Sequence, residues 1–166
     1  MGRLQAAAGS IVFLAVAPGI VAGLVPWLLT GWDSSDPPVS VQVAGWVVLV
    51  AGAAVLIEAF GRFVLEGIGT PAPVAPTEKL VVGGLYRYVR NPMYLAVAAV
   101  ILGQAAVLGS WLLVAYVLVF GAVVWSFVHW YEEPSLRRRF GGEYEEYLST
   151  VPGWWPRLRA SPRRES

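Results

Sequence analysis

The chain contains no cysteine, and this absence removes several classes of site. Without a thiol there is no disulfide framework, no thiolate nucleophile and no cysteine-ligated metal. Histidine is nearly as scarce, because His129 is the single one in 166 residues. Zinc needs about three to four protein ligands, and no clustered spacing of ligand residues supplies them. We therefore predict that the protein holds no metal.

Charged residues are also few. Charged residues make up 14% of the chain, whereas a soluble domain carries about 25%. Hydrophobic residues make up 57%, and the mean hydropathy is +0.60. This composition predicts an all-α integral membrane protein.

Apolar runs long enough to cross a bilayer occupy most of the chain, at roughly residues 6–29, 41–60, 93–109 and 111–130. At a rise of about 1.5 Å per residue, a run of about 20 residues crosses a hydrocarbon core of about 30 Å. The first run is too long for the apolar part of a signal peptide and is not followed by a small-residue cleavage site, so we interpret it as a retained span. We expect about four transmembrane helices. The last two form a tight helical hairpin, because only Gly109 and Ser110 connect them.

Basic residues are missing from one side of this arrangement. The loop at 30–40 contains Asp33 and Asp36 but no Lys or Arg. With four spans, all twelve basic residues lie on the same side as both termini: Arg3, Arg62, Lys79, Arg87, Arg90, Arg137, Arg138, Arg139, Arg157, Arg159, Arg163 and Arg164. The positive-inside bias then predicts that both termini and the 61–92 loop are cytoplasmic. The net charge is only +1, which argues against nucleic acid as a partner.

Three local sequence patterns predict details of the structure. The connector GIGTPAPVAPTEK at 67–79 is rich in Pro and Gly and is expected to be non-helical. Asn91 followed by Pro92 is typical of a helix start, with Asn as the N-cap and Pro in the first helical position. Glu58, near the end of the second span, either pairs with Arg62 at i+4 or lines a polar cavity.

Polar residues concentrate at the cytoplasmic ends of the last two spans, in GGLYRYVRNPMY at 83–94 and YEEPSLRRRFGGEYEEY at 131–147. Carboxylates beside aromatic faces and Arg suit a zwitterionic, partly cationic ligand. The alternative is structural: the Arg and Glu residues close the bundle with salt bridges, and the tyrosines form an interfacial belt. We adopt this alternative for the run 137–139, whose three arginines look like membrane anchors. After the last span, short cytoplasmic helices are expected, because apolar residues recur at three- and four-residue steps: Leu136, Phe140, Tyr144, Tyr147 and Leu148.

These two segments, followed by VPGWWP, resemble the isoprenylcysteine carboxyl methyltransferase and phospholipid methyltransferase superfamily of integral-membrane methyltransferases, and the small bacterial members most closely. The resemblance covers about residues 62–157. It implies S-adenosylmethionine bound at the cytoplasmic rim and a lipophilic small-molecule substrate that enters from the bilayer, among membrane lipids. It also implies a multi-pass protein of the bacterial inner membrane. The domain organisation is then two N-terminal transmembrane helices in 1–60, a catalytic core in 61–157 and a disordered tail in 158–166.

The resemblance also implies the site residues. Cofactor contacts fall on Glu78, Lys79, Leu80, Val81, Tyr86, Asn91, Pro92, Met93, Tyr94 and Glu132. Candidate catalytic residues are Arg90, Glu133 and His129, the last two as general bases for an amine or hydroxyl acceptor; Tyr94 is a third candidate base. Two positions depart from the family pattern. Asn91 replaces a frequent His, and Val128 replaces an Arg that binds the substrate carboxylate in eukaryotic members, so a prenylcysteine carboxylate is not the expected acceptor.

Two other functions remain open. Sterol-reductase-like membrane proteins share a similar polar rim and use a nicotinamide cofactor, so a reductase is one alternative. A non-catalytic membrane scaffold or sensor is the other. The soluble dinucleotide fingerprint is absent, because Gly83–Gly84 is not a G-x-G-x-x-G after a strand, so no Rossmann domain is expected.

Overall fold

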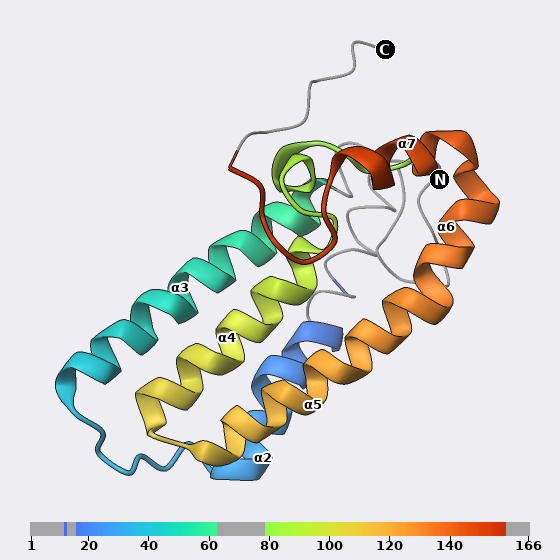
Figure 1. Cartoon of the computed structure of the whole chain (residues 1–166). Helices are drawn as coiled ribbons and strands as arrows, with labels where there is room; N and C mark the ends of the chain where they lie inside the picture. Colours follow the sequence, from blue (N-terminus) through green and yellow to red (C-terminus); the bar gives the residue numbers. More distant parts are fainter. Residues whose placement is uncertain (1–11, 13–15, 63–78, 159–166) are drawn as a thin grey trace.

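The structure, a computed structural model, describes residues 12, 16–62 and 79–158. Within these ranges all regular structure is helical, and the long helices lie side by side along one bundle (Figure 1). In chain order the elements are the π-helical turn η1 (Ile20–Leu24), α2 (Val25–Thr30), α3 (Val39–Arg62), the 3-10 turn η3 (Gly84–Arg87), α4 (Pro92–Leu108), α5 (Trp111–Phe127), the π-helical turn η4 (Val128–Glu132), α6 (Glu133–Phe140) and α7 (Gly142–Thr150). The predicted all-α class is confirmed for the described part of the chain.

Two helices in the described part of the chain are long and apolar enough to cross a membrane. They are α3, with 24 residues, and the continuous helix Trp111–Phe140, with 30 residues. Two shorter apolar helices, Val16–Thr30 and α4, lie beside them. The predicted runs thus correspond to helices in the predicted order, although 6–11 and 13–15 of the first run lie outside the described residues. The four-span topology stays a prediction.

Helices α3 and α4 approach each other closely through two glycines. A Cβ atom on Gly45 would lie 2.8 Å from the carbonyl oxygen of Gly103, and one on Gly103 would lie 2.7 Å from the backbone nitrogen of Leu49. Real Cβ atoms essentially never approach backbone atoms this closely. In lipid, where helix association depends on van der Waals packing, small residues permit such contact. Gly45 and Gly103 therefore set the separation of the two helices.

We expect Gly103→Ala to lower the free energy of unfolding by about 1–3 kcal/mol, because the added methyl group must push α3 away from α4. Gly121 of α5 is the matched control, since nothing lies within 4 Å of a Cβ placed on it. Gly121→Ala is expected to leave stability unchanged or raise it by up to about 1 kcal/mol. The measurement is unfolding of the detergent-solubilised protein in mixed micelles. Equal effects of the two substitutions would contradict this packing.

The predicted hairpin joins α4 to α5. Gly109 takes the left-handed conformation that ends α4 (φ 65°), and the Ser110 side chain caps α5 by accepting a hydrogen bond from the Leu113 N–H at 3.4 Å. The 30–40 loop packs on this turn, where the Ser35 N–H donates to the Leu108 carbonyl at 2.9 Å. A turn this short keeps α4 and α5 antiparallel and adjacent, so the start of α4 and the end of α5 lie at the same end of the bundle.

Polar side chains attach the N-terminal helix to this hairpin. The Gln104 amide donates to the Ala22 carbonyl at 2.7 Å, and the Tyr116 hydroxyl donates to the Val21 carbonyl at 2.8 Å. Both acceptors belong to η1, where the π-helical turn interrupts the regular helical bonding. Side-chain donors from α4 and α5 thus fix the N-terminal helix against the bundle.

Helix α5 continues through η4 into α6, and the chain then turns at Gly141 (φ 51°) into α7. Figure 1 shows α7 lying across the end of the bundle. Tyr144, Tyr147 and Val151 form a buried cluster there, against which Leu136, Phe140 and Leu148 pack. The predicted apolar stripe and short C-terminal helices are confirmed.

Three further local predictions have different outcomes. Glu58 pairs with Arg62 at 2.8 Å, as the i+4 spacing predicted. The connector at 67–79 lies outside the described residues except for Lys79, and the tail at 158–166 lies outside them except for Leu158. Their predicted conformations stay predictions.

Candidate functional site

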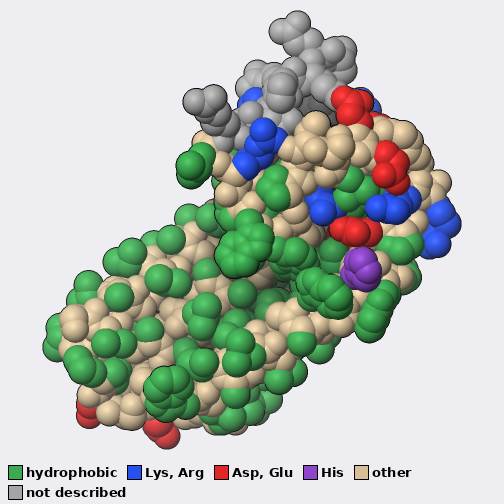
Figure 2. All heavy atoms as spheres, viewed as in Figure 1, with side chains coloured by type: hydrophobic (Ala, Val, Ile, Leu, Met, Phe, Trp, Pro, Cys, Tyr) green, Lys and Arg blue, Asp and Glu red, His purple; other side chains and the backbone are tan. Residues whose placement is uncertain are grey.

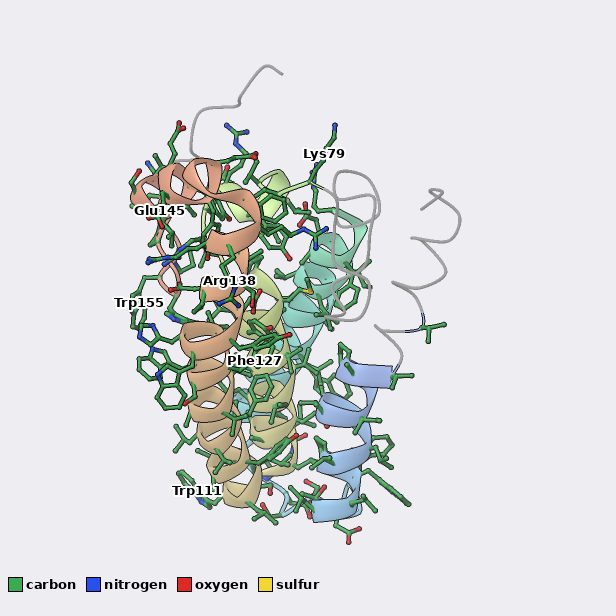
Figure 3. All side chains as sticks on the ribbon, turned by 90° about the vertical axis from the view of Figure 1, so that its right-hand side faces the viewer. Lys79, Trp111, Phe127, Arg138, Glu145 and Trp155 are labelled. Carbon is green, nitrogen blue, oxygen red and sulfur yellow. The ribbon has the colours of Figure 1, made fainter. Side chains whose placement is uncertain are left out.

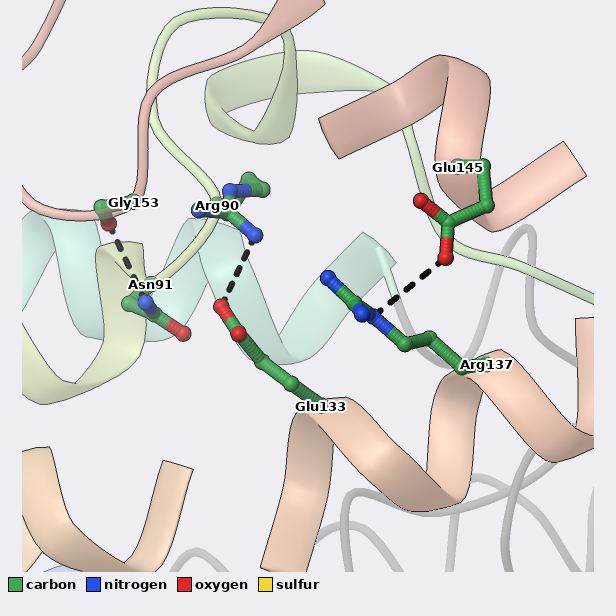
Figure 4. A network of polar contacts seen from close by, with 6 residues as sticks. All are labelled: Arg90, Asn91, Glu133, Arg137, Glu145 and Gly153. Atoms are coloured by element: carbon green, nitrogen blue, oxygen red, sulfur yellow. Dashed lines mark hydrogen bonds and ion pairs between the residues drawn. The ribbon is translucent and has the colours of Figure 1, made fainter. Parts of the chain in front are cut away.

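The C-terminal segment is tied to the start of α4 by backbone and side-chain hydrogen bonds. The Arg90 N–H donates to the Pro152 carbonyl at 2.9 Å, and the Arg157 N–H donates to the Tyr88 carbonyl at 3.0 Å. The Asn91 amide donates to the Gly153 carbonyl at 3.1 Å (Figure 4). These bonds join residues 152–157, which follow the second polar segment, to residues of the first polar segment that lie more than sixty positions earlier in the chain.

Asn91 occupies the predicted position but acts differently from the prediction. It is the residue before α4, and Pro92 is in the first turn. Its side chain makes no capping bond to the helix and bonds to Gly153 instead. Asn91 is also buried, and its amide links two segments of the chain instead of capping α4.

A cavity of about 680 Å³ lies beneath these segments. Its apolar wall comes from the N-terminal helix, α3, α4 and α5, and includes Val21, Leu56, Phe60, Val97, Phe120 and Phe127. Its polar end comes from the residues before α4 and from η4 and α6. Figure 2 shows charged side chains gathered over this end of the molecule and hydrophobic ones over the rest of this face, except for acidic side chains at the opposite end. The volume is that of a pocket for a small organic molecule.

Two consecutive carboxylates stand at the polar end with different partners. The Tyr94 hydroxyl donates to Glu132 Oε2 at 2.9 Å. Arg90 Nη1 contacts Glu133 Oε1 at 2.9 Å (Figure 4), and both side chains are less than one-fifth exposed. Successive residues of a helix point about 100° apart, so Glu132 and Glu133 reach partners on different sides. Glu133 is neutralised by Arg90, whereas Glu132 receives a neutral donor.

The cavity lining also includes three tyrosines, Tyr86, Tyr144 and Tyr147. The Tyr147 hydroxyl donates to the Tyr86 carbonyl at 2.7 Å, so α7 is fixed to η3. Burial raises the pKa of Tyr144 to about 12 from an ordinary value of about 10, and the charge of Glu133 adds to the rise. Burial also raises the pKa values of Tyr86 and Tyr147. All three phenols are therefore neutral near pH 7, where they offer hydroxyl groups and aromatic faces but no charge.

Most of the predicted site residues meet at this cavity. Its lining includes eight predicted cofactor residues, namely Leu80, Val81, Tyr86, Asn91, Pro92, Met93, Tyr94 and Glu132, and two predicted catalytic residues, Arg90 and Glu133. Lys79 is exposed and is not part of the lining. Glu78 lies outside the described residues.

His129 is the predicted catalytic residue that the structure does not bring to the cavity. It is exposed, and its ring stacks on Trp125 with 5.3 Å between the ring centroids. Its neighbour Val128 lines the cavity. One step along the helix turns a side chain by about 100°, so His129 points away when Val128 points inward. His129 therefore lies outside the cavity lining, and its assignment as a general base stays a prediction.

Other lining residues were assigned only structural roles from the sequence. Tyr144 and Tyr147 were interpreted as members of an apolar stripe, and Arg138 and Arg139 as membrane anchors, yet all four line the cavity. The run of three arginines gave no sign that its members differ. In the structure Arg138 and Arg139 line the cavity, whereas Arg137 pairs with Glu145 of α7.

Comparison with known proteins identifies the family of this chain. A family model described as phospholipid methyltransferase matches residues 41–143, well over half of the chain. The chain belongs to the phospholipid methyltransferase family. The apolar helices fit a membrane-associated member of this family.

A similar protein is the protein-S-isoprenylcysteine O-methyltransferase of Schizosaccharomyces pombe, which is 36% identical over 80 residues. The alignment covers 46% of this chain and 33% of the yeast protein. The chain thus spans about one third of the length of this relative. The superfamily that the motifs at 83–94 and 131–147 indicated is confirmed.

Proposed function

We propose that this protein transfers a methyl group from S-adenosylmethionine to a lipophilic acceptor that reaches the cavity from the bilayer. The observation that carries the proposal is the cavity itself. One end presents Glu132, Tyr94 and neutral aromatic groups, and the remainder is apolar. A polar cofactor and a lipid tail require these two environments side by side.

The residues at the polar end fit S-adenosylmethionine. Its sulfonium group supplies an electrophilic methyl when bound. Its amino group suits Glu132, a carboxylate without a cationic partner in the described part of the chain. Arg90 Nε is buried and has no hydrogen-bond partner among the described residues, so it is a donor that a ligand oxygen would satisfy.

The contributions of the chain's own residues follow from their contacts. Glu132 and Tyr94 hold the cofactor, with the hydroxyl of Tyr94 fixing the orientation of the carboxylate. Arg90 and Glu133 neutralise each other's charge, so their ion pair fixes the geometry of the polar end of the cavity. The aromatic faces of Tyr144 and Tyr147 exclude water and attract a cation. Methyl transfer then depends on proximity and orientation.

We place the polar end of the cavity at the cytoplasmic face and keep four spans with both termini on that side. The support is the separation of charge. The described basic residues lie mostly toward the end of the bundle that α6 and α7 cover, and the loop at 30–40, which contains Asp33 and Asp36, lies at the other end (Figures 1 and 2). The positive-inside bias assigns the basic end to the cytoplasm.

Calorimetric titration of the detergent-purified protein with S-adenosylhomocysteine tests the proposal. We expect saturable binding at one site per chain, and no binding of a reduced nicotinamide dinucleotide under the same conditions. The control ligand is adenosine, which lacks the amino acid portion that Glu132 would bind. Absence of heat with S-adenosylhomocysteine would overturn the proposal, and binding of the nicotinamide dinucleotide alone would favour a reductase.

A further inference from the structure

The three consecutive arginines of α6 face two different environments. Arg137 Nε pairs with Glu145 Oε1 of α7 at 3.3 Å, outside the cavity (Figure 4). Arg138 and Arg139 belong to the cavity lining, and Arg137 does not. Figure 3 labels Arg138 above Phe127, which belongs to the apolar wall. Two cations therefore stand at the mouth of a largely apolar cavity.

These two cations have no carboxylate partner among the described residues. Arg138 Nη2 donates to the Ser135 hydroxyl at 3.1 Å, and the Arg139 guanidinium lies 5.7 Å from the centroid of the Phe140 ring. The carboxylates that line the cavity are engaged elsewhere, Glu132 with Tyr94 and Glu133 with Arg90. Three Arg and two Glu line the cavity. The lining thus has an excess of positive charge at its mouth.

We propose that Arg138 and Arg139 determine acceptor specificity by binding an anionic group, a carboxylate or a phosphate, carried by the lipophilic acceptor; this rests on the proposed methyl transfer. Guanidinium groups recognise these anions through paired N–H donors, and Arg is weakly hydrated compared with Lys. The acceptor tail lies along the apolar wall. From Glu132 to Phe120 this wall extends about 18 Å at about 1.5 Å per residue, just over half of a hydrocarbon core of about 30 Å.

A simple membrane anchor explains this pair less well. An anchoring Arg extends its guanidinium away from the apolar surface toward water and headgroups, as exposed Arg137 does beside Glu145. Arg138 and Arg139 instead combine solvent exposure with a place in the cavity lining. This is the position from which a headgroup is bound while the tail remains in the apolar part.

The test compares three probes that share a sixteen-carbon chain: hexadecanoic acid, hexadecyl phosphate and hexadecanol. Their dissociation constants are measured by calorimetry in neutral detergent with wild type, Arg138→Gln/Arg139→Gln and Arg137→Gln. We expect wild type and Arg137→Gln to bind the two anions about tenfold more tightly than the alcohol, and the double variant to lose this preference. Affinity for S-adenosylhomocysteine is expected to stay within about twofold in all three proteins.

The contrary outcomes distinguish an error in the acceptor assignment from an error in the proposed function. Equal affinity of wild type for acid, phosphate and alcohol, or equal loss in Arg137→Gln, overturns the acceptor assignment. Loss of S-adenosylhomocysteine affinity in the double variant would assign Arg138 and Arg139 to the cofactor, and this result also overturns the acceptor assignment. Butyl phosphate separates a headgroup from a free anion, because binding as tight as that of hexadecyl phosphate would show that no lipid tail is used. No binding of S-adenosylhomocysteine by wild type contradicts the proposed function itself, independently of the probes.

Discussion

Glu132→Gln is expected to weaken binding of S-adenosylhomocysteine by about 10- to 100-fold. The amide keeps the shape of the carboxylate and still accepts from the Tyr94 hydroxyl, now 2.9 Å from Glu132, but it has no charge for the amino group of the ligand. Hydrogen bonds to charged groups contribute about 1.5–3 kcal/mol, which corresponds to this range. Titration calorimetry measures the affinity, and methyl transfer at low cofactor concentration is expected to fall by the same factor.

Glu145→Gln is the matched control. Glu145 is a carboxylate on the neighbouring helix α7, pairs with Arg137 and does not line the cavity, so its substitution is expected to leave ligand affinity unchanged. Tyr94→Phe tests the support of the carboxylate, with an expected loss smaller than that of Glu132→Gln. Unchanged affinity in Glu132→Gln would refute the assignment of Glu132 to the cofactor and would favour a scaffold.

The second large effect is expected on stability, from Arg90→Met. Glu133 would lose its cation while its side chain is only 18% exposed. Removing one partner of a buried ion pair lowers the free energy of unfolding by about 3–5 kcal/mol. Because Glu133 is partly exposed, we expect a loss of about 3 kcal/mol. Unfolding in mixed micelles measures it.

The double variant Arg90→Met/Glu133→Leu separates the lost ion pair from lost packing. With both charges gone, the stability is expected to recover much of the deficit of Arg90→Met, because no unpaired charge is left. Arg137→Met is the control: its pair with Glu145 is more than half exposed, and the expected loss is at most about 1 kcal/mol. The account fails if Arg90→Met is no more destabilised than Arg137→Met.

Much of the fold was predictable because the sequence patterns that indicate it involve residues close together in the chain. The apolar runs correspond to helices, and Gly109 with Ser110 makes the hairpin that a two-residue connection requires. The i+4 spacing of Glu58 and Arg62 offered their ion pair as one of two alternatives, and the structure shows that pair. Such features depend on helical periodicity and on chain geometry over a few residues, which the sequence contains in full.

The candidate site was predictable in outline and not in detail. The motifs identified Asn91, Tyr94 and Glu132, which line the cavity together. The partner of Asn91 could not be read from the motif, since the Gly153 carbonyl belongs to a segment more than sixty positions away. The same limit applies to Arg90, which is bonded through its backbone to Pro152 and through its side chain to Glu133.

The sequence by itself determined the helical class, the charge asymmetry and the family, because composition, hydrophobic run length and motif spacing are properties of the chain. Only the tertiary structure distinguished His129 from its neighbours on the helix, and Arg137 from Arg138 and Arg139. The physical reason is that each helical step turns a side chain by about 100°. The packing of α5, α6 and α7 then decides whether a side chain faces lipid, a carboxylate or the cavity.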